Sequence, residues 1–309
     1  MTTTDVRGVV RAPTSAILLR LIPLWFLWGG TYIGMALLLR SMPVLMGNGS
    51  RFLVAGVILA GILAIVRGPS VLALNRRQLR SVIVMGVMIL SVGIGMVSLA
   101  ERYVPSGIAA LLVSVMPLWM VLFRVRAGDH PSRLTLAGVA VGLGGLALML
   151  LPGGTTPVSG NDTDVVIWSI GIVLGSLSWA FFSWRSSSYE LPSNPLTTTV
   201  YELITAGVFL TVAGAITGER WDFGAITRES WIGWGYLVIA SLIAYASYVW
   251  LLGNSPISLT STYAYVNPVV AVILGSLIIS EPITHDVAIG LTIVVGGVVL
   301  VVTGERRKG

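Results

Sequence analysis

The feature that most constrains this chain is a succession of apolar stretches separated by short polar segments. Each is about 20 residues long, the length of helix that crosses ~30 Å of hydrocarbon. With 55% hydrophobic and 10% charged residues, the 309-residue chain is too apolar for one soluble domain. We therefore predict an all-α membrane protein of ten transmembrane helices. The predicted spans are 16–39, 43–66, 79–99, 105–123, 133–151, 166–185, 196–217, 231–252, 256–279 and 286–303.

Several classes of site are absent from the sequence. There is no cysteine, and the two histidines, His130 and His285, both lie in polar segments. The string GLGG at 142–145 lies inside a span, where a dinucleotide loop does not belong. The arginines do not form a basic face with interleaved aromatics. We expect no catalytic residue, no metal, no cofactor and no nucleic-acid partner.

The basic residues give the chain an orientation, because Lys and Arg concentrate in cytoplasmic loops. With the N-terminus inside, the inner segments hold fourteen of the 19 basic side chains and one, Arg51, lies within a span. The outer segments hold four, namely Arg40, Arg102, Arg220 and Arg228. This bias predicts a multi-pass protein of the cell inner (plasma) membrane with both termini cytoplasmic.

The chain also matches itself at an offset of 151 residues. Trp28 falls on Trp179, and Pro105, Pro117 and Pro131 fall on Pro256, Pro268 and Pro282. Five spans per copy is an odd number, so the second copy enters the membrane from the opposite side. Such inverted repeats commonly hold a substrate site near the midplane between the halves and work by alternating access. The predicted division is an N-terminal tail 1–15, repeat one 16–151, an external linker 152–165, repeat two 166–303 and a C-terminal tail 304–309.

Ionisable residues inside the spans are costly and commonly functional. Arg51 in the second span and Glu202 in the seventh are equivalent at the 151-residue offset. They either pair structurally or face the pathway, where Glu202 is our candidate for a coupling proton. Glu101 lies in the turn before the fourth span, so we expect it near the membrane surface as a residue of the outer mouth.

Two prolines fall well inside spans, and proline removes a backbone N–H and kinks a helix. Pro117 and Pro268 are therefore expected to break their helices beside the pathway, although a plain packing kink is the alternative. The polar and aromatic residues just before them are candidates to line it, namely Ser114 in the first copy and Tyr263, Tyr265 and Asn267 in the second.

A set of aromatic residues lies deeper than an interfacial belt. Rings with one polar handle suit a pocket for a mainly apolar solute, although helix packing is the alternative. The first and sixth spans contribute Trp28, Thr31, Tyr32, Trp179, Phe182 and Ser183, and Trp119, Tyr245 and Tyr248 extend the set. Away from it, Gly138 and Gly142 form a small-xxx-small pattern, which predicts close packing of the fifth span on the tenth.

Four segments carry a resemblance to a known family: WGGTY from Trp28, AERYVPSGIAALLVSVMPLW at 100–119, SLSWAF around Trp179, and TSTYAYVNPVVAVILG at 260–275. Together they resemble the drug/metabolite transporter superfamily, and within it the EamA-type ten-helix exporters of the YedA-like branch. The resemblance implies secondary-active export of small metabolites, such as amino acids, their analogues or toxic amphipathic compounds. It implies a small-molecule substrate, a lipid bilayer and a monomer or weak homodimer. A lipid or head-group translocase and an uptake carrier of the same fold stay open as alternatives, whereas an enzyme is not expected.

Overall fold

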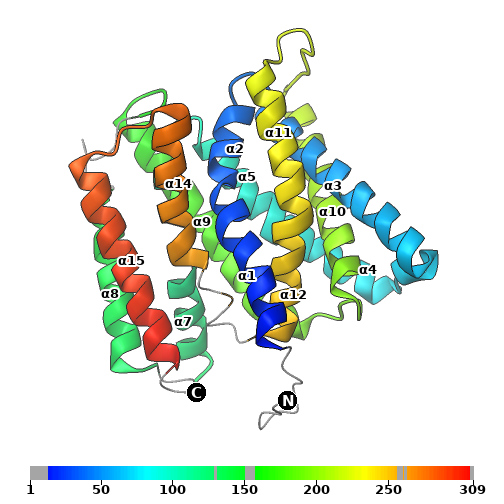
Figure 1. The fold of residues 1–309 in the computed structure, drawn as a ribbon, viewed down its shortest axis with the longest axis horizontal. Helices are drawn as coiled ribbons and strands as arrows, with labels where there is room; N and C mark the ends of the chain where they lie inside the picture. The colour runs from blue at the N-terminus through cyan, green and yellow to red at the C-terminus, as the bar shows by residue number, and fades with distance from the viewer. Residues whose placement is uncertain (1–12, 129–130, 150–156, 256–259, 261–262, 307–309) are drawn as a thin grey trace.

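The computed structural model describes residues 13–128, 131–149, 157–255, 260 and 263–306, and all of the regular secondary structure in them is helical (Figure 1). In the first half the elements are α1 (Thr14–Gly29), α2 (Thr31–Leu38), α3 (Val44–Arg67), η1 (Pro69–Leu72), α4 (Arg76–Met85), η2 (Gly86–Ile94), α5 (Gly95–Ala100), α6 (Ser106–Val113), α7 (Met116–Arg126) and α8 (Arg133–Met149). In the second half they are α9 (Asp162–Arg185), η3 (Ser186–Ser188), α10 (Pro195–Ile216), α11 (Arg228–Ala240), η4 (Ser241–Tyr245), α12 (Ala246–Asn254), α14 (Tyr263–Ile279) and α15 (His285–Arg306).

Seven helical stretches within the described residues are long and apolar enough to cross a membrane. They are Ser15–Leu38, Val44–Arg67, Arg76–Ala100, Ser106–Phe123, Asp162–Ser188, Pro195–Ile216 and Arg228–Asn254. Arg133–Gly142, Val266–Ile279 and His285–Val301 are shorter apolar helices. Parts of the spans expected at 133–151 and 256–279 lie outside the described residues. The all-helical, membrane-spanning character expected from the sequence is confirmed.

Two antiparallel helix pairs form opposite flanks of the bundle, α8 with α15 and α3 with α10 (Figure 1). A methyl group on Gly138 would come within 2.6 Å of the backbone nitrogen of Val301, and one on Gly297 within 2.6 Å of that of Gly142. Small residues let the two backbones approach this closely, which is how helices associate where apolar burial gives little drive. The expected packing of the fifth span on the tenth is thus confirmed.

Several spans are interrupted near the middle of the bundle. The first span divides at Gly30 into α1 and α2, and the fourth divides at Ser114 and Val115 into α6 and α7. The break expected beside Pro117 is therefore present. Pro268 lies inside α14, which continues past it as one helix, and the kink expected there stays a prediction. Two further interruptions were not expected: η2 and η4 are π-helical, a widened geometry that is frequent at functional sites.

The ends of two helices extend into segments expected to be tails or linkers. Asn161 caps α9, accepting hydrogen bonds from the N–H groups of Thr163 and Asp164, so the helix begins at Asp162. At the C-terminal end, α15 continues to Arg306. Parts of the predicted linker 152–165 and tail 304–309 are therefore helical.

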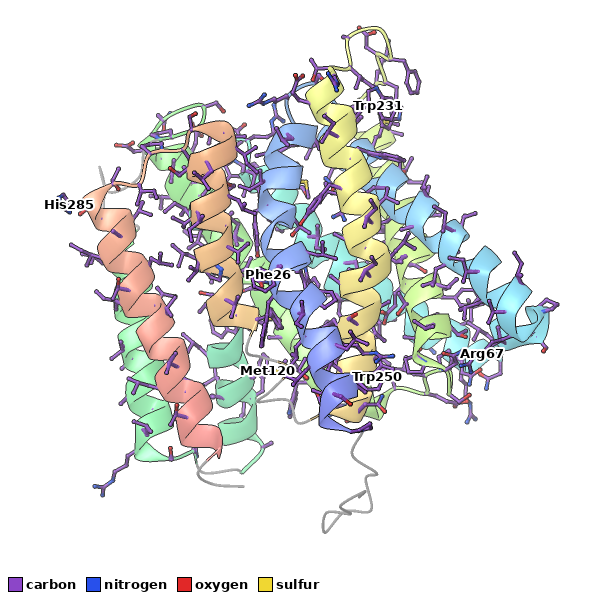
Figure 2. All side chains as sticks on the ribbon, in the orientation of Figure 1. Phe26, Arg67, Met120, Trp231, Trp250 and His285 are labelled. Carbon is purple, nitrogen blue, oxygen red and sulfur yellow. The ribbon has the colours of Figure 1, made fainter. Side chains whose placement is uncertain are left out.

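Apolar side chains cover the flanks of the bundle, and Phe26 on α1 is one exposed example (Figure 2). Among the labelled residues, Trp231 and His285 lie toward one end of the helices, whereas Arg67 and Trp250 lie toward the other (Figure 2). The start of α1 and the end of α15 share the latter end (Figure 1). An apolar flank between two such ends is the surface that a helical bundle presents to lipid.

Candidate functional site

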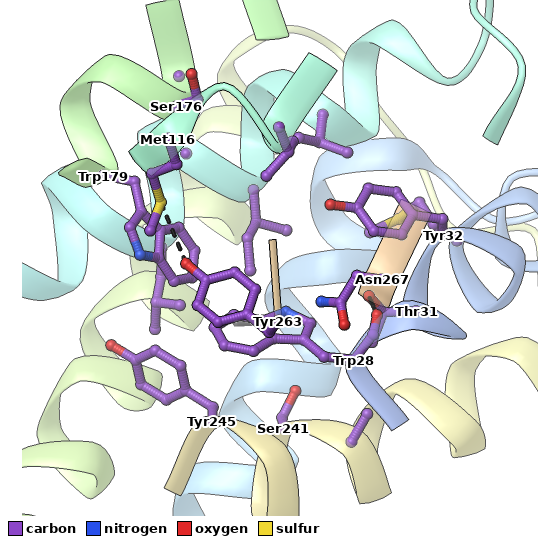
Figure 3. Close-up of a pocket in the computed structure, with 18 of the residues that line it drawn as sticks. Trp28, Thr31, Tyr32, Met116, Ser176, Trp179, Ser241, Tyr245, Tyr263 and Asn267 are labelled. Carbon is purple, nitrogen blue, oxygen red and sulfur yellow. Dashed lines mark hydrogen bonds between the residues drawn. The ribbon is translucent and has the colours of Figure 1, made fainter. Parts of the chain in front are cut away.

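A pocket lies where the interrupted spans meet, with about 820 Å³ of atom-free space, part of it continuous with open solvent. Side chains from both halves of the chain line it (Figure 3). Nine of the candidate site residues are among them, eight expected on the pathway and Glu101 expected at the outer mouth: Trp28, Thr31, Tyr32, Arg51, Glu101, Trp179, Tyr245, Tyr263 and Asn267.

Five rings form what we call the aromatic end of the pocket: Trp28, Trp179, Tyr245, Tyr248 and Tyr263. Trp28 is central, with its ring centroid 5.1 Å from those of Tyr248 and Tyr263 and 5.4 Å from that of Trp179. It stacks on Tyr263 at 23° and meets Tyr248 edge-on at 73°. Offset and edge-on arrangements of this kind are the favourable ones for aromatic pairs.

The polar atoms of the aromatic end bond to protein groups. The Trp179 Nε1–H donates to the Tyr248 hydroxyl at 3.1 Å, and that hydroxyl is 3.0 Å from Ser183 Oγ. The Tyr263 hydroxyl donates to the sulfur of Met116 at 3.3 Å, which Figure 3 marks. These bonds fix the rings in place, so the aromatic end is formed before any solute arrives.

Asn267 ties α14 to α1 at the base of this cluster. With its amide nitrogen facing the surrounding carbonyls, it donates to the oxygens of Trp25 at 2.9 Å and Leu24 at 3.2 Å. Those carbonyls are one turn before Trp28. The bond therefore holds the helix that carries the central ring.

Arg51 and Glu101 form what we call the polar end of the pocket. Arg51 on α3 is only 3% exposed, and its guanidinium donates from Nε to Asn48 Oδ1 at 2.9 Å and from Nη1 to Ser241 Oγ at 2.8 Å. These bonds orient the group at the pocket wall. Nη2 has no hydrogen-bond partner among the residues that the structure describes.

Glu101 lies in the turn before the fourth span, as expected, but it is buried instead of solvated, and its role at the outer mouth stays a prediction. It follows the last residue of α5, is 4% exposed and lines the pocket. Neither carboxylate oxygen has a hydrogen-bond partner among the described residues. Burial raises the pKa of the Glu101 carboxyl well above its usual range; the nearby carboxylate of Glu281 adds to this and the guanidinium of Arg51 opposes it.

Glu202 lies behind the pocket wall instead of on it. It is 2% exposed, and its Oε2 accepts a hydrogen bond of 2.6 Å from the Tyr245 hydroxyl, which does line the pocket. Arg51 takes other partners, so the two residues equivalent at the 151-residue offset are not an ion pair here.

The remaining expected residues surround the pocket without lining it. The Ser114 hydroxyl donates to the Leu111 carbonyl, and the Trp119 Nε1–H donates to Ser176 Oγ, a lining atom, at 3.1 Å. Phe182 packs against Phe181 with centroids 5.2 Å apart. Tyr248 packs behind the lining rings of Trp28, Trp179 and Tyr263, and Ser183 bonds to its hydroxyl. Pro268 does not line the pocket. The side chains of Pro117 and Tyr265 lie outside the description, although Met116, next to Pro117, does line the pocket.

Half of the lining residues that the sequence did not reveal come from the π-helical interruptions and their neighbours. They include Leu90, Gly93, Ile94, Val97, Ala240 and Ser241. One available signal was the 151-residue offset, which maps Leu90 onto Ser241. Apolar residues in an apolar span otherwise carry no sign of which face they occupy.

The geometry suits binding better than bond-making. A ring box with an arginine and an unpartnered carboxyl at its other end can hold a small solute that is apolar at one end and charged at the other. No group of three or more metal-ligating side chains was found in the part of the chain that the structure describes.

Comparison with known proteins agrees with this reading. The chain is 37% identical over 287 residues to the uncharacterized inner membrane transporter YedA of Escherichia coli K12, covering 92% of this chain and 90% of that protein. It is 22% identical to the uncharacterized transporter YoaV of Bacillus subtilis, covering 94% and 99%, and 26% identical to protein PecM of Dickeya dadantii, covering 89% and 88%.

One crystal structure superposes on 96% of this chain and 100% of its own with a TM-score of 0.69, at 18% identity, which supports the fold alone. The model of the EamA-like transporter family matches twice, at residues 15–151 and 166–303. These names are those of membrane transporters and not of enzymes. The chain belongs to the EamA-like transporter family, in the drug/metabolite transporter superfamily.

Proposed function

We propose that the protein is a secondary-active exporter of small metabolites, which it moves from the cytoplasm by alternating access. The solutes are amino acids, their analogues or other amphipathic and toxic compounds. The observation that carries the proposal is the pocket itself, which joins a preformed aromatic end to a buried arginine and carboxyl inside a membrane bundle. Charges are retained at such depth where they meet a solute or ion.

Alternating access needs two halves that can exchange conformations, and we propose two inverted five-helix repeats, 16–151 and 166–303, joined by 152–165. Contacts between α3 and α10 support this. A methyl on Gly56 would come within 2.7 Å of Ile204, and one on Gly207 within 2.6 Å of Leu53. Adding 151 turns Leu53 and Gly56 into Ile204 and Gly207, so the offset exchanges one contact for the other, as a two-fold axis in the membrane plane requires.

The interruptions support the same arrangement. Adding 151 to residues 90–94, the end of η2, gives 241–245, which is η4. Both segments line the pocket, through Leu90 and Ser241. A ten-span topology completes the repeats if α8, α14 and α15 also cross the membrane. In this arrangement Pro117, Ser114, Phe182, Tyr265 and Pro268 belong to helices that move around the pocket.

We place the protein in the inner membrane with both termini cytoplasmic, acting as a monomer or weak homodimer. The basic residues support this orientation, because fourteen of them fall in the segments on the side of the N-terminus. Arg67 and the end of α15 lie toward the same end of the bundle as the start of α1 (Figures 1 and 2).

The test is efflux from proteoliposomes that contain the purified full chain. The vesicles are loaded with a panel of amino acids, aromatic amines and cationic dyes, with and without an imposed pH gradient. We expect one solute class to leave these vesicles faster than it leaves protein-free vesicles. Unlabelled solute of the same class, added on either side, should compete with this efflux. An Arg102→Gln variant, which changes an exposed arginine, is the matched control for an Arg51→Gln variant.

Other outcomes decide between the alternatives. Movement of a fluorescent lipid between leaflets, with no solute efflux, would make the protein a lipid or head-group translocase. Accumulation from outside under an inward proton gradient would make it an uptake carrier. Equal efflux from vesicles with and without protein, for every solute, would contradict the proposal.

A further inference from the structure

Glu101 is the one buried carboxyl in the described residues that lines the pocket with both oxygens unpartnered. An ionised carboxylate accepts several hydrogen bonds, and leaving it without any in a buried site costs far more than a surface charge. Either a proton or a ligand donor has to satisfy this group. The pocket it lines is where such a donor would arrive.

The surroundings also disfavour its charge. Glu101 caps the C-terminal end of α5, where unpaired carbonyls give the helix partial negative charge. Glu281 brings a second carboxylate nearby. That carboxylate is itself satisfied, because it accepts hydrogen bonds from the N–H groups of Ser106 and Gly107 at 2.9 and 3.3 Å and from Ser106 Oγ at 2.8 Å. The Glu281 carboxyl therefore holds the N-terminus of α6, and its proximity disfavours a charge on Glu101.

One positive group opposes this repulsion. Arg51 of α3 acts on Glu101 through space, but among the described residues it donates to Asn48, Ser241 and the Leu237 carbonyl and not to the carboxyl. Tyr32 of α2 lies on the same side of the pocket and interacts with Glu101 electrostatically. On α9, which packs against α5, Asp164 bonds instead to the backbone N–H of Asn161. Glu101 thus lies between the guanidinium of Arg51, which already donates hydrogen bonds to other residues, and groups that favour the neutral form of the Glu101 carboxyl.

Glu202 differs in just this respect. Its Oε2 already has a donor in Tyr245, and it is one side chain behind the wall. A solute cannot take the place of its proton without first displacing that hydroxyl.

We propose that Glu101, rather than Glu202, is the carboxyl that exchanges a proton for the ammonium group of a transported solute. The proposal rests on the transport function above. With the pocket empty, the carboxyl holds a proton. When an amine-bearing solute enters, the O–H bond breaks, the proton passes to water on the open side, and the ammonium donates to the carboxylate. On the other side a proton from water re-forms the O–H bond and the solute leaves, so one proton moves against one solute.

The first experiment locates the proton without any transported solute. Infrared spectra of the full-length protein in nanodiscs report the C=O stretch of protonated carboxyls as a function of pH. We expect a protonated band at pH 7 that is absent from Glu101→Gln and present in both Glu202→Gln and the exposed control Glu190→Gln. Glu101→Asp keeps a carboxyl and is expected to shift the band. A spectrum at pH 7 that Glu101→Gln leaves unchanged would overturn the proposal.

The second experiment uses the solute that moves in the efflux panel. Glu101→Gln cannot release a proton, so we expect it to keep downhill exchange. The acceleration of efflux by a pH gradient should be at least tenfold smaller in this variant than in the unaltered protein. A variant that responds to the gradient like the unaltered protein would overturn the proposal, as would the same loss in Glu202→Gln alone. If the unaltered protein moves no solute, the transport function fails, and the infrared result still decides where the proton is held.

Discussion

The two ends of the pocket differ in how complete they are. In the aromatic end, the hydroxyls and ring nitrogens of Trp179, Tyr245, Tyr248 and Tyr263 bond to protein atoms and the rings pack on one another. In the polar end, none of the described residues donates to Glu101, and one nitrogen of Arg51 has no acceptor among them. The first end is preorganised by the fold, and the second is completed by what binds there. Shape selection and charge recognition are thereby separated within one cavity.

Removal of the central ring should give the largest change, and mainly in stability. Trp28→Ala takes away contacts with Trp179, Tyr248 and Tyr263 and should lower the free energy of unfolding by about 3–5 kcal/mol. Thermal unfolding in detergent measures the loss, and Trp28→Phe, which keeps a ring, should recover most of it. If Trp28→Ala instead unfolds like the unaltered protein while losing transport, the aromatic end is a contact surface for the solute and not a preformed wall.

Removal of the guanidinium should act on binding more than on folding. Hydrogen bonds to a charged group contribute about 1.5–3 kcal/mol, so Arg51→Gln should weaken apparent solute affinity by roughly 10- to 150-fold. Arg51→Lys keeps the charge without the planar guanidinium, and its apparent solute affinity should fall between those of the unaltered protein and Arg51→Gln. Competition of unlabelled solute in the efflux assay gives these affinities. Equal affinities in Arg51→Gln and Arg102→Gln would show that the polar end does not meet the solute.

Removal of one hydroxyl should have the smallest effect. Tyr248→Phe deletes the group that joins Trp179 to Ser183 and should cost about 1 kcal/mol of stability, with transport reduced less than threefold. Tyr103→Phe, on a ring that stacks on Trp168 away from the pocket, is the matched control. A loss of apparent solute affinity as large as that of Arg51→Gln would place Tyr248 in direct contact with the solute.

The sequence predicted the aromatic end better than the polar end, for a physical reason. Large rings and charges stand out in an apolar span, so type and depth point to Trp28, Trp179 and Arg51, whereas Tyr263 is a candidate because it lies just before Pro268. The burial of Glu101 in the pocket wall was not predicted, because position along a span gives depth in the membrane and not the face of the helix. Its turn folds back against the bundle, and that packing is not readable from a single chain.

The 151-residue repeat likewise did not predict which side chains are in contact. The 151-residue offset gave Arg51 and Glu202 equivalent positions, but equivalence about an axis does not bring two side chains into contact. Arg51 instead meets Ser241 of η4, whose π-helical geometry has no compositional mark. The break at Pro117 followed from proline chemistry, whereas Pro268 is accommodated within α14.

The central claim is that this pocket opens alternately to the two sides of the membrane, and the chain tests it directly because it contains no cysteine. Thr31→Cys places one thiol on the pocket wall, and Ser188→Cys and Ser159→Cys place controls in exposed segments expected inside and outside. A membrane-impermeant thiol reagent is applied to right-side-out and to inside-out vesicles. We predict that Thr31→Cys reacts from both faces while each control reacts from one. Reaction of Thr31→Cys from a single face, in a variant that still transports, would contradict the account.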